Sequence, residues 1–263
     1  MLKNHVFAII GGDLRQVYLA NELAELGCRV YGILFDNNVN LSEKVIKTND
    51  FESVLPICDV AIFPLPVSTD GENINAPLSK FKIPIDDCIK YISSGCDVFC
   101  GLASEKIIEK FKSNNIEVQD YFNREELAVL NAVPTAEGAV ALAMQELATT
   151  IYGSKCMIVG FGRISKVLVK LLTAFGAKVK VVARKCSDLE WIKIYGCEAV
   201  HVSQLEKNVS DVDILFNTVP AMLLNEDILF LLKKDCLVID LASKPGGEEF
   251  ILDKFLYCSA FEN

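Results

Sequence analysis

The sequence has few of the residues that hold metal ions. Only two of its 263 residues are histidine, His5 and His201, and none of its ten cysteines forms a Cys-x-x-Cys pair. Most of these cysteines stand within apolar runs, where a reduced thiol acts as a small hydrophobic side chain. We therefore expect no metal site, no disulfide framework and no catalytic thiol.

The sequence also lacks a long uninterrupted apolar run. The densest stretch, Val219 to Leu232, is broken by Asn225, Glu226 and Asp227, whereas a membrane helix needs roughly 18 consecutive apolar residues. The chain passes directly from its first four residues into a strand-like run, without the hydrophobic segment and cleavage site of a signal peptide. These features predict a cytoplasmic protein with no membrane partner.

Positive charge is in short supply, with 26 Lys and Arg against 35 Asp and Glu and a net charge of −9. Because nucleic acids and anionic membranes attract basic surfaces, we expect neither as a partner. A few local cations can still bind a small anionic substrate. Hydrophobic residues make up 51% of the chain, which is typical of a globular protein, and the length favours two compact domains.

The first half alternates between short apolar runs and amphipathic stretches. The runs predict strands, and the stretches predict helices. The expected strands are Val6–Ile10, Arg29–Phe35, Val60–Phe63 and Asp97–Phe99, and the expected helices are Leu14–Leu26, Pro84–Ser94 and Ala103–Asn114. This alternation indicates βαβ units around a parallel sheet that helices cover on both faces.

A helical region separates the first half from a second series of the same kind. It predicts two helices, Glu125–Leu130 and Ala136–Thr149, with Pro134 ending the first and Thr135 capping the second. The second series comprises strands Lys155–Val159, Lys178–Ala183, Asp213–Phe216 and Cys236–Asp240, with a helix over Arg163–Phe175.

The fold class that these patterns predict is α/β, with two Rossmann-like domains that have parallel sheets and are joined by a long helical connection. We place a substrate- and partner-binding domain at residues 1–130 and an inter-domain helix at 131–150. An NAD(P)-binding Rossmann domain follows at 151–247, and a shortened tail at 248–263.

The strongest motif is the loop Gly160-Phe161-Gly162-Arg163-Ile164-Ser165, between a strand and a helix. The first glycine permits a tight turn, and the second lets the backbone approach a pyrophosphate at the positive end of the helix. Ser165 departs mildly from the usual Gly or Ala at the third position. The motif predicts dinucleotide binding, with these cofactor-contacting residues: Gly160, Phe161, Gly162, Arg163 and Ile164.

The next strand ends in Val182-Ala183-Arg184-Lys185. An NAD-specific domain usually has an acidic residue near this point, which accepts a hydrogen bond from the ribose 2′-hydroxyl. Arg184 and Lys185 could instead pair with a 2′-phosphate, which favours NADP(H) over NAD(H). The alternative is that both are solvated basic side chains in a loop.

Two further strand ends turn from apolar to polar. Asn217, Thr218 and Val219 follow one strand, and Ala242, Ser243 and Lys244 follow the other. Ligands bind at the carboxyl ends of the strands in a parallel sheet. We therefore assign the first five of these residues to the cofactor and Lys244 to the substrate.

In the first half, Gly11-Gly12-Asp13-Leu14-Arg15-Gln16 lies at a strand-to-helix junction but lacks the Gly-x-Gly-x-x-Gly spacing. It indicates a small-ligand loop, in which Asp13 and Arg15 contact the substrate and Arg15 holds a carboxylate bidentately. A surface arginine at the start of a helix is an equally good interpretation. Ser68, after Pro64-Leu65-Pro66, is a further substrate candidate.

Five segments together resemble the A subunit family of bacterial dipicolinate synthase, which acts in endospore formation. They span almost the whole chain. They are Gly11–Gln16, Pro64–Ser68, Arg124–Gly138, Gly160–Arg163 and Asp240–Gly247. The segment Asn-Ala-Val-Pro-Thr-Ala-Glu-Gly at 131–138 is far more specific than any Rossmann glycine.

The resemblance implies NADP-dependent oxidation of a dihydrodipicolinate-type intermediate of lysine biosynthesis to pyridine-2,6-dicarboxylate. It also implies that the partner is a flavoprotein-like B subunit, in the mother-cell cytoplasm. Asn131, Thr135 and Glu137 would line a cleft between the domains, with Glu137 as general base. Glu137 could equally be an acid that complements the helix dipole. The sequence leaves open whether the chain forms a homo-oligomer.

The end of the chain departs from this family. The family continues after Gly247 through a strand and a closing helix, whereas Glu248 to Asn263 is a short tail without the expected proline- and glycine-bearing segment. This departure keeps a second hypothesis open, that the chain is a regulatory or non-catalytic subunit that binds NADP. The third hypothesis is an amino- or hydroxy-acid dehydrogenase, which ranks lower because neither histidine stands at a strand end beside the glycine loop.

Overall fold

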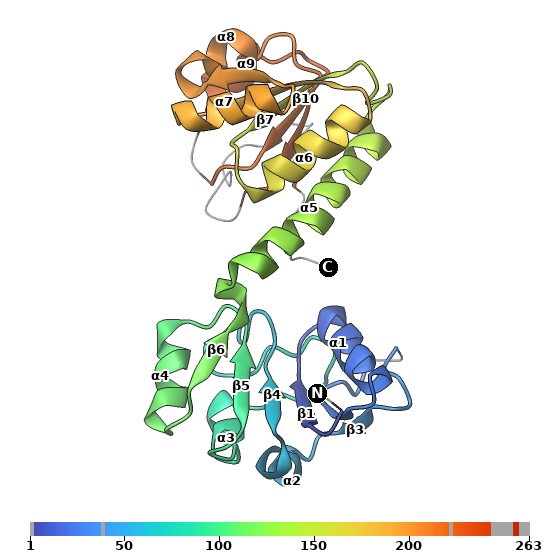
Figure 1. Ribbon diagram of the computed structural model, residues 1–263, viewed down its shortest axis with the longest axis vertical. Helices are drawn as coiled ribbons and strands as arrows, with labels where there is room; N and C mark the ends of the chain where they lie inside the picture. Colours follow the sequence, from blue (N-terminus) through green and yellow to red (C-terminus); the bar gives the residue numbers. More distant parts are fainter. Residues whose placement is uncertain (1–2, 38–39, 221–222, 243–254, 258–263) are drawn as a thin grey trace. The chain divides into compact units, whose positions relative to one another are not determined.

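The computed structural model describes residues 3–37, 40–220, 223–242 and 255–257. The chain forms two compact units, Met1–Leu127 and Ala128–Asn263. Each unit is built around a six-stranded sheet in which neighbouring strands are parallel (Figure 1). Two α/β units with parallel sheets confirm the predicted fold class.

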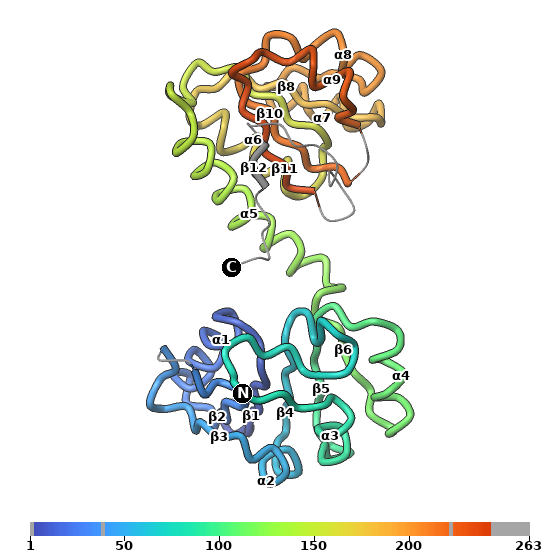
Figure 2. Tube along the Cα trace, turned by 180° about the vertical axis from the view of Figure 1, so that it is seen from behind, coloured from blue at the N-terminus to red at the C-terminus, as the bar shows by residue number. Residues whose placement is uncertain are grey.

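The first sheet has the strand order β3-β2-β1-β4-β5-β6. Its strands are β1 Val6–Ile10, β2 Arg29–Ile33, β3 Ile46–Thr48, β4 Val60–Ile62, β5 Asp97–Cys100 and β6 Val118–Asp120. The helices of this unit are α1 Leu14–Glu25, α2 Phe51–Val54, α3 Ile85–Ile89 and α4 Glu105–Ser113, with 3₁₀ turns at Leu55–Ile57 and Tyr121–Asn123. The chain reverses its direction of travel across the sheet between β1 and β4, which lie side by side in Figure 2.

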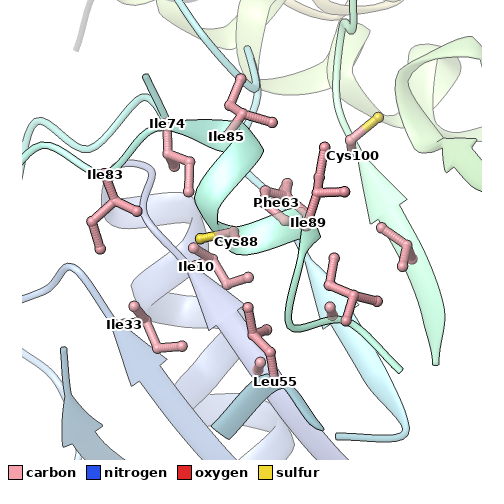
Figure 3. Packing of buried hydrophobic residues seen from close by; sticks show 14 of the residues in the cluster. Ile10, Ile33, Leu55, Phe63, Ile74, Ile83, Ile85, Cys88, Ile89 and Cys100 are labelled. Carbon is pink, nitrogen blue, oxygen red and sulfur yellow. The ribbon is translucent and has the colours of Figure 1, made fainter. Parts of the chain in front are cut away.

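Both faces of this sheet are buried. On one face, Phe7 and Ile9 of β1 pack with Val17 and Ala20 of α1. The other face carries a larger cluster (Figure 3), which includes Ile10 and Ile33 from strands, Phe63 just after β4, and Ile85 and Ile89 from α3. Burial on both sides explains why the strands appear in the sequence as continuous apolar runs rather than alternating ones.

The second sheet has the order β12-β11-β10-β7-β8-β9, the same topology as the first. Its strands are β7 Lys155–Val159, β8 Lys178–Ala183, β9 Glu198–His201, β10 Ile214–Asn217, β11 Leu237–Asp240 and β12 Phe255–Tyr257. Its helices are α5 Glu125–Glu146, α6 Arg163–Ala174, α7 Cys186–Ile194, α8 Leu205–Asn208 and α9 Glu226–Leu231, with a 3₁₀ turn at Val202–Gln204. The reversal here lies between β7 and β10, which is where an open parallel sheet binds its ligand.

The expectation of two helices around Pro134 was wrong. Residues 125–146 form one helix, α5, with Pro134 inside it. Thr135 caps nothing, because its hydroxyl donates to the Asn131 carbonyl at 2.9 Å within the helix. Proline removes a single backbone donor, and the helix continues because Ala136, Ala139 and Ala143 are buried in the core of the second unit. Packing against that core outweighs the local cost of the proline.

Helix α5 is also long and apolar enough to cross a membrane, by length and composition only. The sequence pattern did not indicate this, because Pro134 divides the segment into two shorter predicted helices. In the structure α5 lies beside α6 (Figure 1) and shares a core with it, in which Val140 of α5 and Leu168 of α6 are both buried. The alanine-rich face is the packed side of the helix, and 28% of the apolar window is buried.

The tail of the chain differs from its expected role. Phe255–Tyr257, within the segment that was expected to be only a short tail, forms β12 and pairs in parallel with β11. It supplies the sixth strand of the second sheet. The rest of the tail, residues 248–254 and 258–263, lies outside the described residues.

The described cysteines serve mainly as core side chains. Seven of them are buried, and all nine are free thiols. Burial raises the pKa of Cys88 and of Cys156 to about 12, so both stay protonated at neutral pH. Cys186 is the exposed thiol of the described set.

Candidate cofactor site

The loop that follows β7 requires glycine at its first position. Gly160 has φ of +103°, a conformation that L side chains rarely adopt, and a Cβ there would lie 2.6 Å from both Thr218 Oγ1 and Val219 Cγ2. Its amide donates to the Val182 carbonyl at 2.9 Å, which ties the loop to the end of β8. The turn is therefore tight, and it is closed on one side by the residues that follow β10.

The second glycine has a different role. Gly162 has extended backbone angles (φ −88°, ψ −160°) and occupies the N-cap of α6, where no described side chain caps the helix. A Cβ on Gly162 would meet nothing within 4 Å. The fold itself does not demand glycine here, but a bare backbone leaves open space above the positive end of a 12-residue helix. That is the arrangement in which a Rossmann loop holds a pyrophosphate.

Ser165, which departs from the usual motif, is fully buried and hydrogen-bonded. Its Oγ lies 2.8 Å from Thr218 Oγ1, and Thr218 Oγ1 in turn donates to the Val159 carbonyl at 2.9 Å. Glycine or alanine at this position could not make that bond. The serine therefore joins α6 to the end of β10.

The ends of β10 and β11 are joined by a buried polar pair. Asn217 is 5% exposed and Asp240 is 2% exposed, and Asn217 Nδ2 donates to Asp240 Oδ1 at 3.0 Å. The Ala242 amide donates to the same oxygen at 2.9 Å. Burial raises the pKa of Asp240 above its usual value, although these two hydrogen bonds oppose the shift. The sequence indicated Ser165 only as a departure from the glycine motif and Asp240 only as a strand end, because the burial and hydrogen bonds of both depend on neighbours distant in the chain.

The two candidate 2′-phosphate ligands follow β8 directly. Arg184 and Lys185 are exposed, and Lys185 has extended backbone angles at the N-cap of α7. Ala183, just before them, pairs in register with His201 at the end of β9. The structure therefore places both cations at the carboxyl end of the strand beside β7.

The remaining cofactor candidates have varied surroundings. Phe161 is partly buried, and its ring centroid lies 5.9 Å from that of Tyr195. Ile164 is partly buried and Arg163 is exposed, both in the first turn of α6. Ala242 is buried after β11. Ser243 and Lys244 lie outside the described residues.

The glycine pair of the first unit is covered by the chain itself. Gly11 donates to the Ile33 carbonyl at 2.9 Å, the counterpart of the bond made by Gly160. The Gly12 amide, however, donates to the Asn75 carbonyl at 2.8 Å, and a Cβ on Gly11 would lie 2.7 Å from that same oxygen. The segment at Asn75 thus occupies the approach that a pyrophosphate would need.

Asp13 and Arg15 contact each other closely. Asp13 caps α1 by accepting from the Arg15 amide at 2.9 Å. The Arg15 guanidinium donates to the Asp13 carboxylate, with Nη2 2.7 Å from Oδ2, and also to the Leu65 carbonyl at 2.8 Å. Burial opposes ionisation of Asp13, but the hydrogen bonds and charge of Arg15 outweigh it and hold the pKa of Asp13 below its usual 3.8. Arg15 therefore bridges the helix start and the β4 loop.

Replacing Asp13 by Asn should reveal the electrostatic part of this contact. Asn caps a helix as well as Asp does, so the variant keeps the cap and loses the charge. A lowered native pKa stabilises the fold above the unfolded value of 3.8, and this contribution disappears as the pH falls through the native pKa. Because Arg15 is 44% exposed and Asp13 25%, we expect Asp13→Asn to lower the unfolding free energy by about 0.5–1 kcal/mol at pH 7.

Urea unfolding of both proteins across the acidic range measures this. The difference between them should shrink steadily below pH 4. A difference that persists unchanged at the lowest pH would mean that the charge is not its source.

Ser68 lies in a turn rather than facing open space. Its hydroxyl donates to Asp70 Oδ1 at 3.0 Å and accepts from the Gly71 amide at 2.9 Å. Two residues to which the sequence gave no role, Gln16 and Tyr121, make hydrogen bonds at the end of β4. Gln16 Nε2 and the Tyr121 hydroxyl both donate to the Phe63 carbonyl, at 3.0 and 3.1 Å. Gln16 is a polar residue on the buried face of α1, among apolar neighbours in the helical pattern, and this was the signal in the sequence that could have indicated it.

The three candidates on α5 do not share one face. Asn131 and Thr135 stand four residues apart and are therefore neighbours on the helix surface, whereas Glu137 is two residues beyond Thr135 and points elsewhere. Glu137 is exposed, and Asn131 and Thr135 are partly buried. The structure therefore pairs the two substrate candidates and separates the proposed base from them along the helix surface.

A hollow of about 400 Å³ lies at the amino ends of the strands of the second sheet, away from the glycine loop. Lys155, Lys180 and Asp211 line it, and Asp211 accepts from Lys155 at 2.8 Å and from Lys180 at 3.2 Å. Lys155 begins β7, Lys180 lies in the first half of β8, and Asp211 precedes β10. The hollow is therefore distinct from the glycine loop at the carboxyl ends.

Residues 131–244 match the family described as D-isomer specific 2-hydroxyacid dehydrogenase, NAD binding domain. This match, the doubly wound sheet and the glycine loop define the class: a dehydrogenase-like α/β protein with a domain for a nicotinamide cofactor. Residues 6–122 match the family described as the N-terminal domain of the dipicolinate synthase A subunit.

The chain is 32% identical over 254 residues to the A subunit of dipicolinate synthase from Bacillus subtilis (strain 168), covering 95% of this chain and 84% of the relative. The crystal structure of the A subunit from Bacillus halodurans superposes with a TM-score of 0.84 at 30% identity, covering 95% of this chain and 86% of that one. The crystal structure of the Bacillus subtilis A subunit gives a TM-score of 0.82 at 30% identity, covering 93% and 83%. The chain belongs to the family of dipicolinate synthase A subunits.

Proposed function

We propose that the second unit binds NADP(H) at the loop after β7 and that the chain is the oxidoreductase subunit of a dipicolinate synthase. The observation that carries this proposal is the geometry of Gly160 and Gly162. One glycine is required by a tight turn against Thr218 and Val219, and the other leaves space at the start of α6. The donor set fits a pyrophosphate, since it combines open backbone with a helix N-terminus.

The preference for NADP(H) over NAD(H) rests on Arg184 and Lys185. Both are exposed at the strand end where NAD-specific domains carry an acid. A 2′-phosphate there would receive charge-assisted hydrogen bonds, with Arg184 able to bind it in a bidentate manner.

The proposed reaction is oxidation of a dihydrodipicolinate-type substrate to pyridine-2,6-dicarboxylate during sporulation. The substrate loses a hydride and a proton, and the ring becomes aromatic. When bound, NADP⁺ supplies the hydride acceptor. The protein's part is to orient the ring carbon, hold two carboxylates and accept the proton.

We assign these tasks to residues as the family resemblance suggests. Glu137 would accept the proton. In the first unit the residues proposed for substrate are Asp13, Arg15 and Ser68. In the second they are Asn131, Thr135 and Lys244. Gly160, Phe161, Gly162, Arg163, Ile164, Asn217, Thr218, Val219, Ala242 and Ser243 complete the proposed cofactor contacts.

A flavoprotein-like B subunit is the proposed partner, and the mother-cell cytoplasm the proposed location, both from the family relationship. A non-catalytic NADP-binding subunit is the alternative. The two differ in one assay, since that subunit would bind NADPH and yet form no dipicolinate when combined with the B subunit.

Titration of the purified protein with NADPH and NADH tests the cofactor proposal. The chain has one tryptophan, Trp191, whose ring lies 6.2 Å from that of Tyr195, and Tyr195 lies 5.9 Å from Phe161 in the glycine loop. We expect NADPH to quench Trp191 strongly, because the reduced nicotinamide absorbs where tryptophan emits, and NADH to bind more weakly. Free tryptophan corrects for light absorption by the cofactor. If neither cofactor binds, the enzymatic proposal must be withdrawn.

A further inference from the structure

We propose that Asp240 is a positioning residue that shapes the nicotinamide half of the cofactor site. This inference rests on the proposed function and adds a residue to it. Asp240 is the last residue of β11 and is 2% exposed. Its Oδ1 accepts from Asn217 Nδ2 of β10 at 3.0 Å and from the Ala242 amide at 2.9 Å. One carboxylate oxygen therefore joins two strand ends and the start of the loop that leaves β11.

Through Asn217 the same carboxylate orients the loop after β10. Asn217 Oδ1 accepts from the Val219 amide at 3.2 Å, and Asn217 Nδ2 also donates to the Val219 carbonyl at 3.2 Å. These bonds close the turn over residues 217–219. Asp240 holds the side chain that makes them, and so fixes which way the Asn217 amide faces.

The turn is in direct contact with the glycine loop. Thr218 Oγ1 donates to the Val159 carbonyl and lies 2.8 Å from Ser165 Oγ. Thr218 and Val219 are also the residues that a Cβ on Gly160 would strike. A continuous set of hydrogen bonds and contacts therefore runs from Asp240 to the loop proposed to hold the pyrophosphate.

Burying a carboxylate costs free energy, so the burial of Asp240 is not by itself an argument that it stabilises the fold. Removing a charge from water carries a penalty that well-packed apolar side chains avoid. Burial raises the pKa of Asp240, which reflects that penalty. A buried polar pair whose members have several partners specifies one arrangement of the backbone. Here the arrangement specified is that of two adjacent strand ends at the ligand edge of the sheet.

The position of this pair decides which half of the cofactor it serves. Gly160 follows β7, and Arg184 and Lys185 follow β8, so the adenosine phosphates belong on that side of the reversal point. β10 and β11 lie on the other side. The loops after β10 and β11 are therefore expected to contact the other half of the cofactor, the nicotinamide ribose and ring.

The test compares NADPH with 2′,5′-ADP, a fragment that lacks the nicotinamide half. We expect Asp240→Ala to weaken NADPH binding at least about tenfold while 2′,5′-ADP binding changes less than about twofold. Asp240→Asn should bind NADPH within about threefold of the wild type, since its amide oxygen can accept both hydrogen bonds. Asn217→Ala should show the same selective loss as Asp240→Ala.

Asp211→Ala is the matched control, because Asp211 is a carboxylate near the opposite edge of the same sheet, ion-paired with Lys155 and Lys180. It should leave both affinities unchanged. The inference is overturned if Asp240→Ala binds NADPH normally, if it loses both ligands equally, or if Asp240→Asn loses as much NADPH affinity as Asp240→Ala. If the wild type binds 2′,5′-ADP and Asp240→Ala shows no selective loss of NADPH affinity, this inference alone is wrong. If the wild type binds neither NADPH nor 2′,5′-ADP, the cofactor proposal itself is wrong.

Discussion

Gly160→Ala is expected to weaken NADPH binding at least about a hundredfold. The methyl group would lie 2.6 Å from Thr218 Oγ1 and Val219 Cγ2, in a residue with φ of +103°. Backbone strain and overpacking together cost about 2–5 kcal/mol. The loop would relieve part of this by moving away from Thr218, and the cofactor would have to reverse that movement to bind. Fluorescence titration gives the affinity, and thermal unfolding gives the accompanying loss of stability.

Two other glycines provide controls for this result. Gly153 also has positive φ, +78°, but a Cβ there meets nothing within 4 Å. Gly153→Ala should therefore cost about 1–2 kcal/mol of stability from strain alone and leave NADPH affinity unchanged. Gly162 has ordinary backbone angles and open space around it, so Gly162→Ala should cost at most about 1 kcal/mol of stability, because alanine is a poorer N-cap than glycine, and should weaken binding by obstructing the pyrophosphate.

Normal NADPH affinity in Gly160→Ala would contradict the proposed site directly. Equal losses of affinity in Gly160→Ala and Gly153→Ala would contradict it in another way, because the effect would then follow stability rather than the loop.

The second large effect concerns Arg184 and Lys185. Replacing both by alanine should raise the Kd for NADPH about 10- to 100-fold while the Kd for NADH changes less than about threefold. Hydrogen bonds to a charged phosphate contribute about 1.5–3 kcal/mol each, and the exposure of both side chains lowers their combined contribution below the sum of the two, to about 1.4–2.7 kcal/mol. The salt dependence of NADPH binding should also weaken. Parallel titrations at two ionic strengths measure all of these quantities.

Lys193→Ala is the control for the loss of a nearby positive charge. Lys193 lies in the last turn of α7 and pairs with Glu190 at 2.7 Å. It should leave both affinities unchanged. If the double variant loses NADPH and NADH affinity equally, the two cations do not read the 2′-phosphate. If it loses neither, Arg184 and Lys185 are solvated loop residues, the alternative that the sequence left open.

Local pattern predicted most of the framework. The central strands and the long helices α1, α4 and α6 occur within a few residues of their expected bounds. The short strands Ile46–Thr48 and Val118–Asp120, at or near the sheet edges, were not predicted, because three residues are too few to show a period. Pro134 misled the helix prediction for a physical reason: the local cost of a proline is visible in sequence, and the burial of Ala136 and Ala139 that offsets it is not.

In the candidate cofactor site, too, some features follow from the sequence and others only from tertiary contacts. The glycine loop and the basic pair after β8 are contiguous in sequence, so their spacing alone indicated them. The bonds from Ser165 to Thr218 and from Asn217 to Asp240 join residues 53 and 23 positions apart. Neither bond follows from a local pattern.

By itself, the sequence determined the α/β class and the family and predicted the glycine loop, because each rests on short segments whose residues are close together along the chain. Only the tertiary structure decided that Asn75 covers the first glycine pair, that Arg15 bridges Asp13 and Leu65, and that Asp240 lies buried between two strand ends. The physical reason is that the strand order brings distant segments to the same edge of a sheet. Which polar atoms then meet depends on that order and on the packing beneath them.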